Sequence, residues 1–315
     1  MWKTTNINNN IRRKTSLISI LSVNNLQSII EDWKNNVVNI INSSGDTDRL
    51  AEFALHLSRL LAYPDLDVIN SLKKIDTMGD ELRQAIKKSM PLRPTQIIEE
   101  INNYLFKTKQ FKGNIQDYHN PLNNYLNIVL QQKSGIPITL SILYLRVAYV
   151  LNFSLYPVNF PAHFLVKHVL EDNNNEIIID PFNGGRIMDD YAMKELLDQF
   201  YPLQNVSLTH AFVKKATAGQ VMIRMLNNLK GSYYEAQDID KAEIANEMII
   251  AIDHYNPSAM RDKGMILLKR QKPMEAFQML NSYLELDPEA EDADAVLDII
   301  RQIRAEKNKQ GSREE

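Results

Sequence analysis

The sequence predicts an α+β fold that is mainly helical and has three parts. In the first and last thirds of the chain, apolar residues recur every three or four positions, which is the period of one helix face. Between Gly113 and Tyr201 the pattern changes to one long apolar helix followed by short runs of β-type composition. With 315 residues, the chain is long enough for two or three units with their own cores.

Changes of pattern and composition divide the chain into five expected segments. They are a flexible, Asn-rich segment over 1–25, a helical subdomain over 26–112, an α+β core over 113–205, helical repeats with a capping helix over 206–307, and a tail over 308–315.

The helical subdomain contains four predicted helices. They cover residues 25–41, 46–63, 67–88 and 95–106. In the first, Leu26, Ile29, Ile30 and Trp33 lie on one face. Proline residues indicate where the second helix ends and where the fourth begins.

The central segment contains one long apolar helix. Residues 136–153 carry a single charge, Arg146, and the length alone would allow a membrane helix. Pro137, Asn152, the hydroxyl residues and the central arginine favour a buried core helix instead.

Two short strands are predicted after this helix, over residues 161–170 and 177–180. The polar cluster 171–175 between them is typical of a hairpin turn. A buried helix packed on an antiparallel sheet is an α+β arrangement. The run 183–185, Asn-Gly-Gly, predicts another turn rather than a phosphate cradle, because neither a P-loop nor a GxGxxG motif surrounds it.

The C-terminal helices are weakly self-similar. Lys241-Ala242 and Glu275-Ala276 are 34 residues apart, while Asn256-Pro257 and Asp287-Pro288 are 31 apart. This spacing is the tetratricopeptide period, and residues 293–307 would form the capping helix. Stacked repeats of this type offer a concave surface, so we expect a protein or peptide partner to bind there.

The composition excludes several classes of protein. The chain has no cysteine, so it can form no disulfide, cysteine zinc site, iron–sulfur cluster or cysteine nucleophile of its own. A formal charge of -3 and a pI of about 6.1 argue against nucleic-acid and anionic-membrane binding. The missing cysteine and a mean hydropathy of -0.32 fit a cytoplasmic protein. The sequence does not indicate an oligomeric state.

His163 and Asp180 are the strongest candidates for chemistry. They lie on the two predicted strands, near the ends that are away from the hairpin turn. If the strands pair symmetrically about the turn, the two residues are close to being cross-strand neighbours. An imidazole oriented by a carboxylate is the base half of a catalytic triad. The nucleophile would come from the start of the preceding helix, where Thr139 and Ser141 supply hydroxyls.

Other polar residues carry weaker signals. Tyr118, His119, Asn123 and Asn124 form a polar and aromatic cluster, which either lines the cleft or anchors a loop through hydrogen bonds. His163 and His168 would face opposite sides of a regular strand, so they cannot share a metal ion. Asp189 and Asp190 are interpreted as a helix cap. We expect neither a metal nor a cofactor.

Three stretches of the chain carry a family resemblance. The strings NNYLNIVLQQKSGIPITLSILYLRVA, FPAHFLVKH and IIIDPFNGG resemble the bacterial SirB-one (YchA-like) family. The resemblance covers about residues 46 to 305. It implies a papain-like transglutaminase core, with cysteine, histidine and aspartate in that order along the chain, followed by tetratricopeptide repeats.

Carried over to this chain, the family's histidine matches His163 and its aspartate matches Asp180. The cysteine position falls at about Pro137. The family itself looks cysteine-free here, typically with a serine where this chain has Thr139.

Geometry argues against a hydroxyl replacement. Two residues along a helix rotate a side chain by about 200°, so Thr139 points away from the position of Pro137. Ser141 shares the face of Pro137 but lies one turn deeper. We therefore expect a non-catalytic scaffold or regulator in which His163 and Asp180 form a buried hydrogen-bonded pair. The alternative is a hydrolase or acyl transferase, acting on an amide or ester through Ser141 or Thr139.

Overall fold

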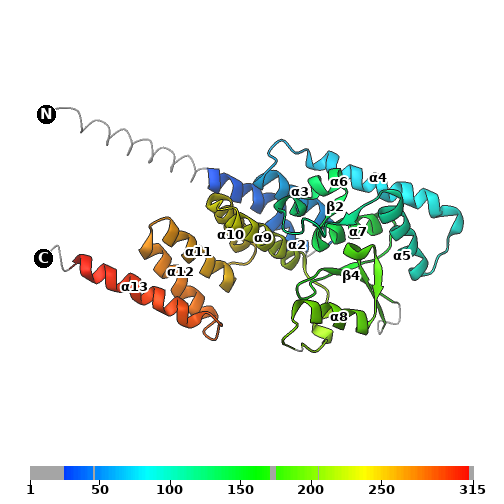
Figure 1. Ribbon diagram of the computed structural model, residues 1–315. Coiled ribbons are helices and arrows are strands. Elements are labelled where there is room, and N and C mark those ends of the chain that lie inside the picture. Colours follow the sequence, from blue (N-terminus) through cyan, green and yellow to red (C-terminus); the bar gives the residue numbers. More distant parts are fainter. Residues whose placement is uncertain (1–24, 45–46, 171–174, 205, 312–315) are drawn as a thin grey trace.

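The computed structural model describes residues 25–44, 47–170, 175–204 and 206–311 of the chain. Most of the expected N-terminal segment and of the turn at 171–175, and the last four residues, lie outside these ranges. Within them the fold is α+β and mainly helical, as predicted. Figure 1 shows the helices of the C-terminal part extending in a row away from the part that holds the sheet.

The N-terminal helices lie close to the predicted positions. Residues 25–44 form one helix with a π-helical turn, η1 (Lys34–Val38), before α2 (Asn39–Ser44). The helices that follow are η2 (Thr47–Arg49), α3 (Leu50–Leu61), α4 (Val68–Ile86), η3 (Lys87–Ser89), α5 (Pro94–Asn102) and the π-helix η4 (Asn103–Thr108).

The centre of the molecule is α7 (Pro137–Val150), which begins at the predicted residue. Its face toward the subdomain packs on α3, α4 and α5, and its opposite face packs on the sheet. Two short elements precede it, η5 (Pro121–Asn124) and α6 (Leu126–Gln132), and the pair β1 (Lys112–Gly113) and β2 (Ser134–Gly135) is parallel. No helix in the described ranges combines the length and apolarity that a membrane crossing requires.

The sheet is an antiparallel meander of four strands, whereas the sequence predicted only two. Its strands, in spatial order, are β3 (Tyr156–Val158), β4 (Leu165–Val169), β5 (Glu176–Asp180) and β6 (Arg186–Met188). The outer strands have three residues each, too few to show an alternating pattern. The first predicted strand was too long, because residues 161–163 form a turn before β4.

The two faces of the sheet bury different side chains. Val166 and Ile179 belong to the cluster around α7, while Leu165 and Ile178 pack toward α8 (Asp190–Phe200). Asp189 caps α8 by accepting a hydrogen bond from the Ala192 amide, which confirms the predicted cap. The predicted glycine turn is also present, since Gly184 and Gly185 have φ angles of 72° and 78°. The 3₁₀ helix η6 (Pro181–Asn183) precedes this turn, and a second one, η7 (His210–Val213), follows α8.

Five helices form the C-terminal part. They are α9 (Ala218–Glu235), α10 (Ile239–Ile252), α11 (Pro257–Lys269), α12 (Pro273–Leu286) and α13 (Ala293–Gly311). The pairs α9–α10 and α11–α12 correspond to the two predicted repeats. The predicted capping helix is α13, which continues to Gly311.

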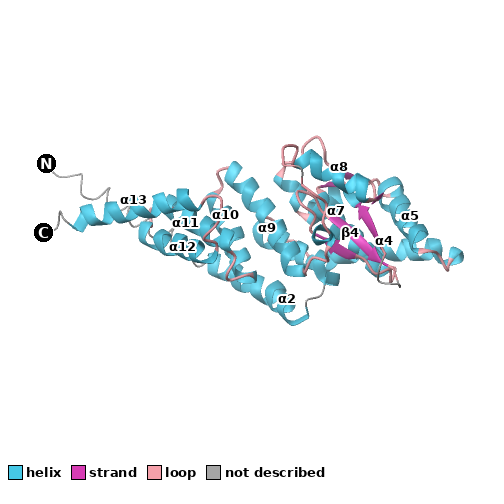
Figure 2. Ribbon diagram, turned by 90° about the horizontal axis from the view of Figure 1, so that it is seen from below, coloured by secondary structure: helices cyan, strands magenta, loops and turns pink. Residues whose placement is uncertain are grey.

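The first repeat is joined to the rest of the molecule. Residues of α9 and α10, among them Met225 and Met248, belong to the same apolar cluster as α3, α6 and α7. The indole of the buried Trp33 donates a hydrogen bond to the carbonyl oxygen of Met248 at 3.1 Å. In Figure 2, which shows the molecule from below, α2 again lies beside α9 and α10.

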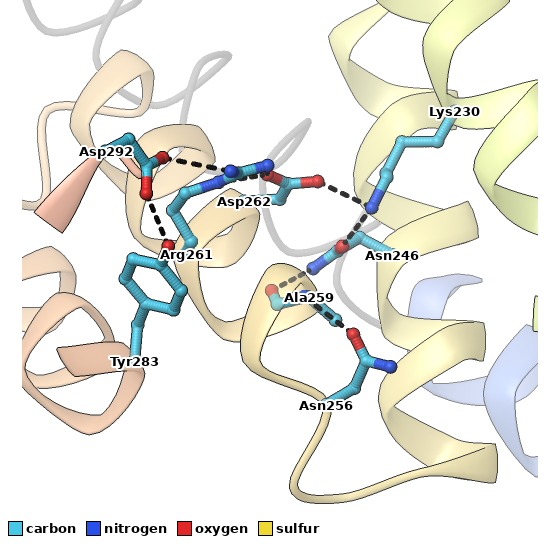
Figure 3. Close-up of polar contacts among 8 residues, drawn as sticks. All are labelled: Lys230, Asn246, Asn256, Ala259, Arg261, Asp262, Tyr283 and Asp292. Atoms are coloured by element: carbon cyan, nitrogen blue, oxygen red, sulfur yellow. Dashed lines mark hydrogen bonds and ion pairs between the residues drawn. The ribbon is translucent and has the colours of Figure 1, made fainter. Parts of the chain in front are cut away.

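A polar network connects the first repeat to the second (Figure 3). The side chain of Lys230 on α9 is 6% exposed, and its ammonium group lies 2.6 Å from a carboxylate oxygen of Asp262 on α11. It also donates to Asn246 on α10 at 3.1 Å, and the Asn246 amide donates to the carbonyl oxygen of Ala259 at 2.9 Å. The network continues through Arg261 to Asp292, which accepts a hydrogen bond from Tyr283. It fixes how α11 stacks on α9 and α10.

Removing the buried cation should destabilise the protein. In Lys230→Met, the Asn246 oxygen and one Asp262 oxygen lose their donor inside the protein. We expect the free energy of unfolding to fall by about 2 kcal/mol, measured by urea unfolding with circular dichroism. Arg301→Ala is the control, because its ion pair with Asp298 is exposed, and it should change the value by less than about 0.5 kcal/mol. Equal effects of the two variants would contradict this account.

Candidate functional site

His163 lies in the turn that leads into β4, not on the strand. Its backbone N–H donates to the carbonyl oxygen of Phe160 at 3.1 Å, and the preceding Ala162 has a positive φ of 53°. A left-handed φ is uncommon for alanine, so the surrounding contacts must hold it. Arg224 on α9 supplies one, because its guanidinium donates to the same carbonyl oxygen of Phe160 at 2.8 Å. The first repeat therefore helps to fix the turn that carries His163.

Asp180 is the last residue of β5 and caps η6. One carboxylate oxygen accepts hydrogen bonds from the backbone amides of Phe182 and Asn183, at 3.0 and 3.3 Å. The other accepts from the side-chain amide of Asn183 at 2.7 Å. The carboxylate is thus fixed by its own turn. Asn183 was predicted only as part of a glycine turn, although aspartate followed by proline is a signal for a helix cap.

The two side chains are in contact. Nε2 of His163 lies 3.0 Å from Oδ1 of Asp180, and the side chains are only 4% and 1% exposed. Burial by itself raises the pKa of Asp180, but the hydrogen bond and charge of His163 and the hydrogen bonds from Asn183 outweigh it, so the pKa is lower than usual. The ionised carboxylate of Asp180 accepts a hydrogen bond from the Nε2–H of His163, which fixes the orientation of the imidazole ring.

Thr139 is fully buried and its hydroxyl serves the start of α7. Its Oγ1 accepts a hydrogen bond from the backbone N–H of Ile136 at 3.2 Å. It also lies 3.0 Å from the carbonyl oxygen of Asn123 and 3.2 Å from that of Ile136, to one of which it donates. This hydroxyl therefore caps the helix and anchors the preceding loop.

Ser141 is also fully buried. Its Oγ lies 3.5 Å from the carbonyl oxygen of Phe164, the residue after His163. Within the described chain, neither Ser141 nor Thr139 has a hydrogen bond to His163. Pro137, at the position matched to the family's cysteine, is the first residue of α7 and is buried.

The predicted polar cluster divides between two roles. Asn123 anchors the loop, because its amide donates to the carbonyl oxygens of Asp117 and Tyr118 and its Oδ1 accepts from Asn114. Tyr118, His119 and Asn124 line a pocket of about 260 Å³ against α9. This pocket is separate from the histidine, which is not among its lining residues.

Aromatic side chains connect the pocket to the histidine. The rings of His163 and Phe182 are T-shaped at 5.8 Å between centroids, and so are those of Phe182 and Tyr118 at 5.9 Å. His168 faces elsewhere, stacked on Phe153 and hydrogen-bonded to the carbonyl oxygen of Ser154. Among the residues that the structure describes, no group of three or more His, Asp or Glu side chains is placed to hold a metal ion.

Comparison with known proteins places the chain in a family. A model described as the transglutaminase-like superfamily matches residues 70–227, and a tetratricopeptide repeat model matches residues 229–301. The UPF0162 protein of Xylella fastidiosa (strain Temecula1) is 30% identical over 239 residues, which cover 74% of this chain and 83% of that protein. This chain belongs to the UPF0162 family of transglutaminase-like proteins. The predicted family resemblance is thereby confirmed.

Two further relatives of this UPF0162 protein are similar over different shares of the chain. The UPF0162 protein YchA of Escherichia coli (strain K12) is 25% identical over 240 residues, which cover 76% of this chain and 84% of that protein. F-box only protein 21 of Mus musculus is 36% identical over 141 residues, 43% of this chain and 21% of that protein. The latter similarity is therefore confined to part of each chain.

The lowered pKa of Asp180 predicts how this UPF0162 protein responds to acid. Since the folded pKa is below the unfolded one, ionised Asp180 contributes stability above the ordinary aspartate pKa of about 4, and this contribution is lost as the pH falls through the folded pKa. Asp180→Asn cannot titrate, so it should lose less stability than the wild type between about pH 6 and pH 3 in urea unfolding.

Asn183→Ala is the companion variant. It removes one hydrogen bond to the Asp180 carboxylate, which should raise the pKa of Asp180 and move the loss of stability to higher pH. An identical pH dependence in the wild type and in Asp180→Asn would show that Asp180 makes no such contribution.

Proposed function

We propose that this protein is a non-catalytic, cytosolic scaffold that binds a protein or peptide partner through its tetratricopeptide repeats. The chain has a transglutaminase-like core, two repeats and no cysteine. Tetratricopeptide repeats generally mediate protein interactions. In this proposal the core supports the repeats, and the contact between His163 and Asp180 stabilises the core.

The observation that carries the proposal is how the hydroxyls on α7 are used. A serine or threonine nucleophile must reach its general base, at about 2.6–3.2 Å, and must also reach a substrate. Thr139 and Ser141 are both fully buried, and each faces backbone carbonyl oxygens instead. Proline, at the position matched to cysteine, has no side-chain group that can attack or lose a proton. The histidine and aspartate are then a base and its orienter without a nucleophile.

The repeats provide the exposed surface that a partner needs. Tyr255 and Met265 are 76% and 39% exposed, although both are large and apolar. The network from Lys230 to Asp292 fixes the second repeat on the first, so this surface is presented by a rigid frame. A surface already in its bound shape loses less entropy on association.

The absence of catalysis can be tested directly. We expect purified protein to show no stoichiometric labelling by a fluorophosphonate or acylating probe, measured by intact-protein mass spectrometry. Labelling of one site that disappears in Ser141→Ala or Thr139→Val would overturn the scaffold proposal and favour the hydrolase or acyl transferase.

Partner binding can be tested with surface variants of the full chain. We expect Tyr255→Glu and Met265→Glu to reduce partner capture at least tenfold in quantitative affinity purification, because each places a charge in an apolar contact. The His163→Ala variant should capture the same partners as the wild type, provided that circular dichroism shows an intact fold. Partners lost in His163→Ala but retained in both surface variants would assign binding to the core instead of the repeats.

A further inference from the structure

The four-stranded sheet has one covered edge and one open edge. At the β3 edge, Val158 forms an antiparallel bridge with Lys215. The Ala216 amide also donates to the carbonyl oxygen of Pro157 at 2.8 Å, so the chain after α8 covers this edge. At the other edge, β6 pairs only with β5, and residues 186–188 have no hydrogen bond to any other segment that the structure describes. Such an edge presents N–H and C=O groups with which another strand can pair.

A groove of about 540 Å³ runs beside the open edge. One wall is β6 with the turn before it, and the other is the helix formed by α5 and η4. The helix residues that line the groove recur every three or four positions from Thr95 to Lys107, so they form one face of the helix. At about 1.5 Å per residue, this face is about 18 Å long. An extended segment of about five or six residues, at about 3.3 Å each, has the same length.

Asn102 and Gly185 hold the helix beside the strand. The Asn102 amide donates to the carbonyl oxygen of Gly185 at 2.8 Å, and its Oδ1 accepts from the hydroxyl of the buried Tyr144 at 2.9 Å. A Cβ at Gly185 would lie 1.8 Å from Oδ1 of Asn102, so this approach requires glycine. The groove is therefore formed before any partner arrives, which lowers the entropy cost of binding.

The two faces of β6 offer different contacts. Ile187 is opposite Ile179 in the sheet, so it lies on the face toward α7, and it is 48% exposed. Ile98 and Phe106 add apolar area to the groove. Arg186 lies on the opposite face of the sheet, because side chains alternate along a strand. A strand added at this edge would place every second side chain beside Ile187 and the others beside Arg186.

Charge indicates which polar residues fit the groove. Lys107 on the helix and Arg186 on the strand are both exposed, and neither has an ion-pair partner within the described ranges. Of the described residues that line the groove, Glu99 alone is acidic. Asp189, which follows β6, is outside the lining and caps α8. The two cations therefore favour a segment that carries carboxylates, whereas a second copy of this chain would bring the same two cations to the edge.

We propose that this groove binds an extended segment of a protein partner, in which acidic and apolar residues alternate and which pairs with β6 as a fifth strand. Its apolar side chains contact Ile187 and Phe106, and its carboxylates are attracted by Arg186 and Lys107. In strand addition of this kind, main-chain hydrogen bonds provide affinity and alternate side chains provide specificity. The inference goes beyond the scaffold proposal, because this surface belongs to the core and not to the repeats.

Synthetic peptides test the strand pairing on the full chain, measured by isothermal titration calorimetry. The Glu-Val peptide, acetyl-(Glu-Val)₃-amide, should bind at least tenfold more tightly than the Lys-Val peptide, acetyl-(Lys-Val)₃-amide. Two further Glu-Val peptides carry N-methyl groups on all the glutamate amides or on all the valine amides. Since alternate N–H groups of an added strand face β6, at least one of the two should bind at least tenfold more weakly than the parent peptide.

A charge reversal in the protein tests the side-chain contacts. In Lys107→Glu/Arg186→Glu both cations become anions, so the Lys-Val peptide should now bind at least tenfold more tightly than the Glu-Val peptide. The control Lys73→Glu/Lys74→Glu makes the same change of charge on exposed residues of α4 outside the groove, and should keep the wild-type order. Ile187→Ser should weaken Glu-Val binding at least threefold. Thermal unfolding confirms that each variant is folded.

The outcomes separate this inference from the scaffold proposal. The inference is wrong if the Glu-Val peptide does not bind, if both methylated peptides bind as tightly as the parent, or if the charge reversal keeps the wild-type order. A dimer in sedimentation velocity that Ile187→Ser dissociates would assign the edge to a second copy, and would also overturn it. Tyr255→Glu should leave peptide binding unchanged. Probe labelling at Ser141 would overturn the scaffold role without changing the peptide results.

Discussion

The rest of the structure depends on the burial of α7. Twelve of its fourteen residues are buried, because the N-terminal helices pack on one side and the sheet on the other. Inside such an environment every polar group must find a partner in the protein. The hydroxyls of Thr139 and Ser141 therefore face carbonyl oxygens, and the start of the helix is occupied by its own capping contacts. The structural requirements of this helix thus engage both hydroxyls that the sequence offers as candidate nucleophiles.

Elements with long, regular patterns were predictable from the sequence. The stripes of the N-terminal helices, the apolar α7 and the spacing of the repeats each depend on residues close together in the chain. The outer strands β3 and β6 were missed because each has three residues and is specified by pairing with its neighbour. A pairing of that kind is a property of the folded sheet, so no local pattern reveals it.

The candidate site was predictable in part. The contact between His163 and Asp180 followed from two short motifs, but the expected geometry was wrong. The register pairs Val166 with Ile179, so His163 lies beyond the paired residues and reaches Asp180 from a turn. The pocket that Asn124 lines could not be predicted, because it requires contact between segments far apart in the sequence.

The position of α9 affects how the protein can be divided. The two family matches meet between residues 227 and 229, in the middle of this helix, whose side chains complete the apolar cluster around α6 and α7. The boundary between the two family matches therefore falls inside the apolar cluster, not at its edge. A fragment ending at residue 227 would lose Leu229 and Tyr233 from its core, and a fragment starting at 229 would expose half of an apolar helix.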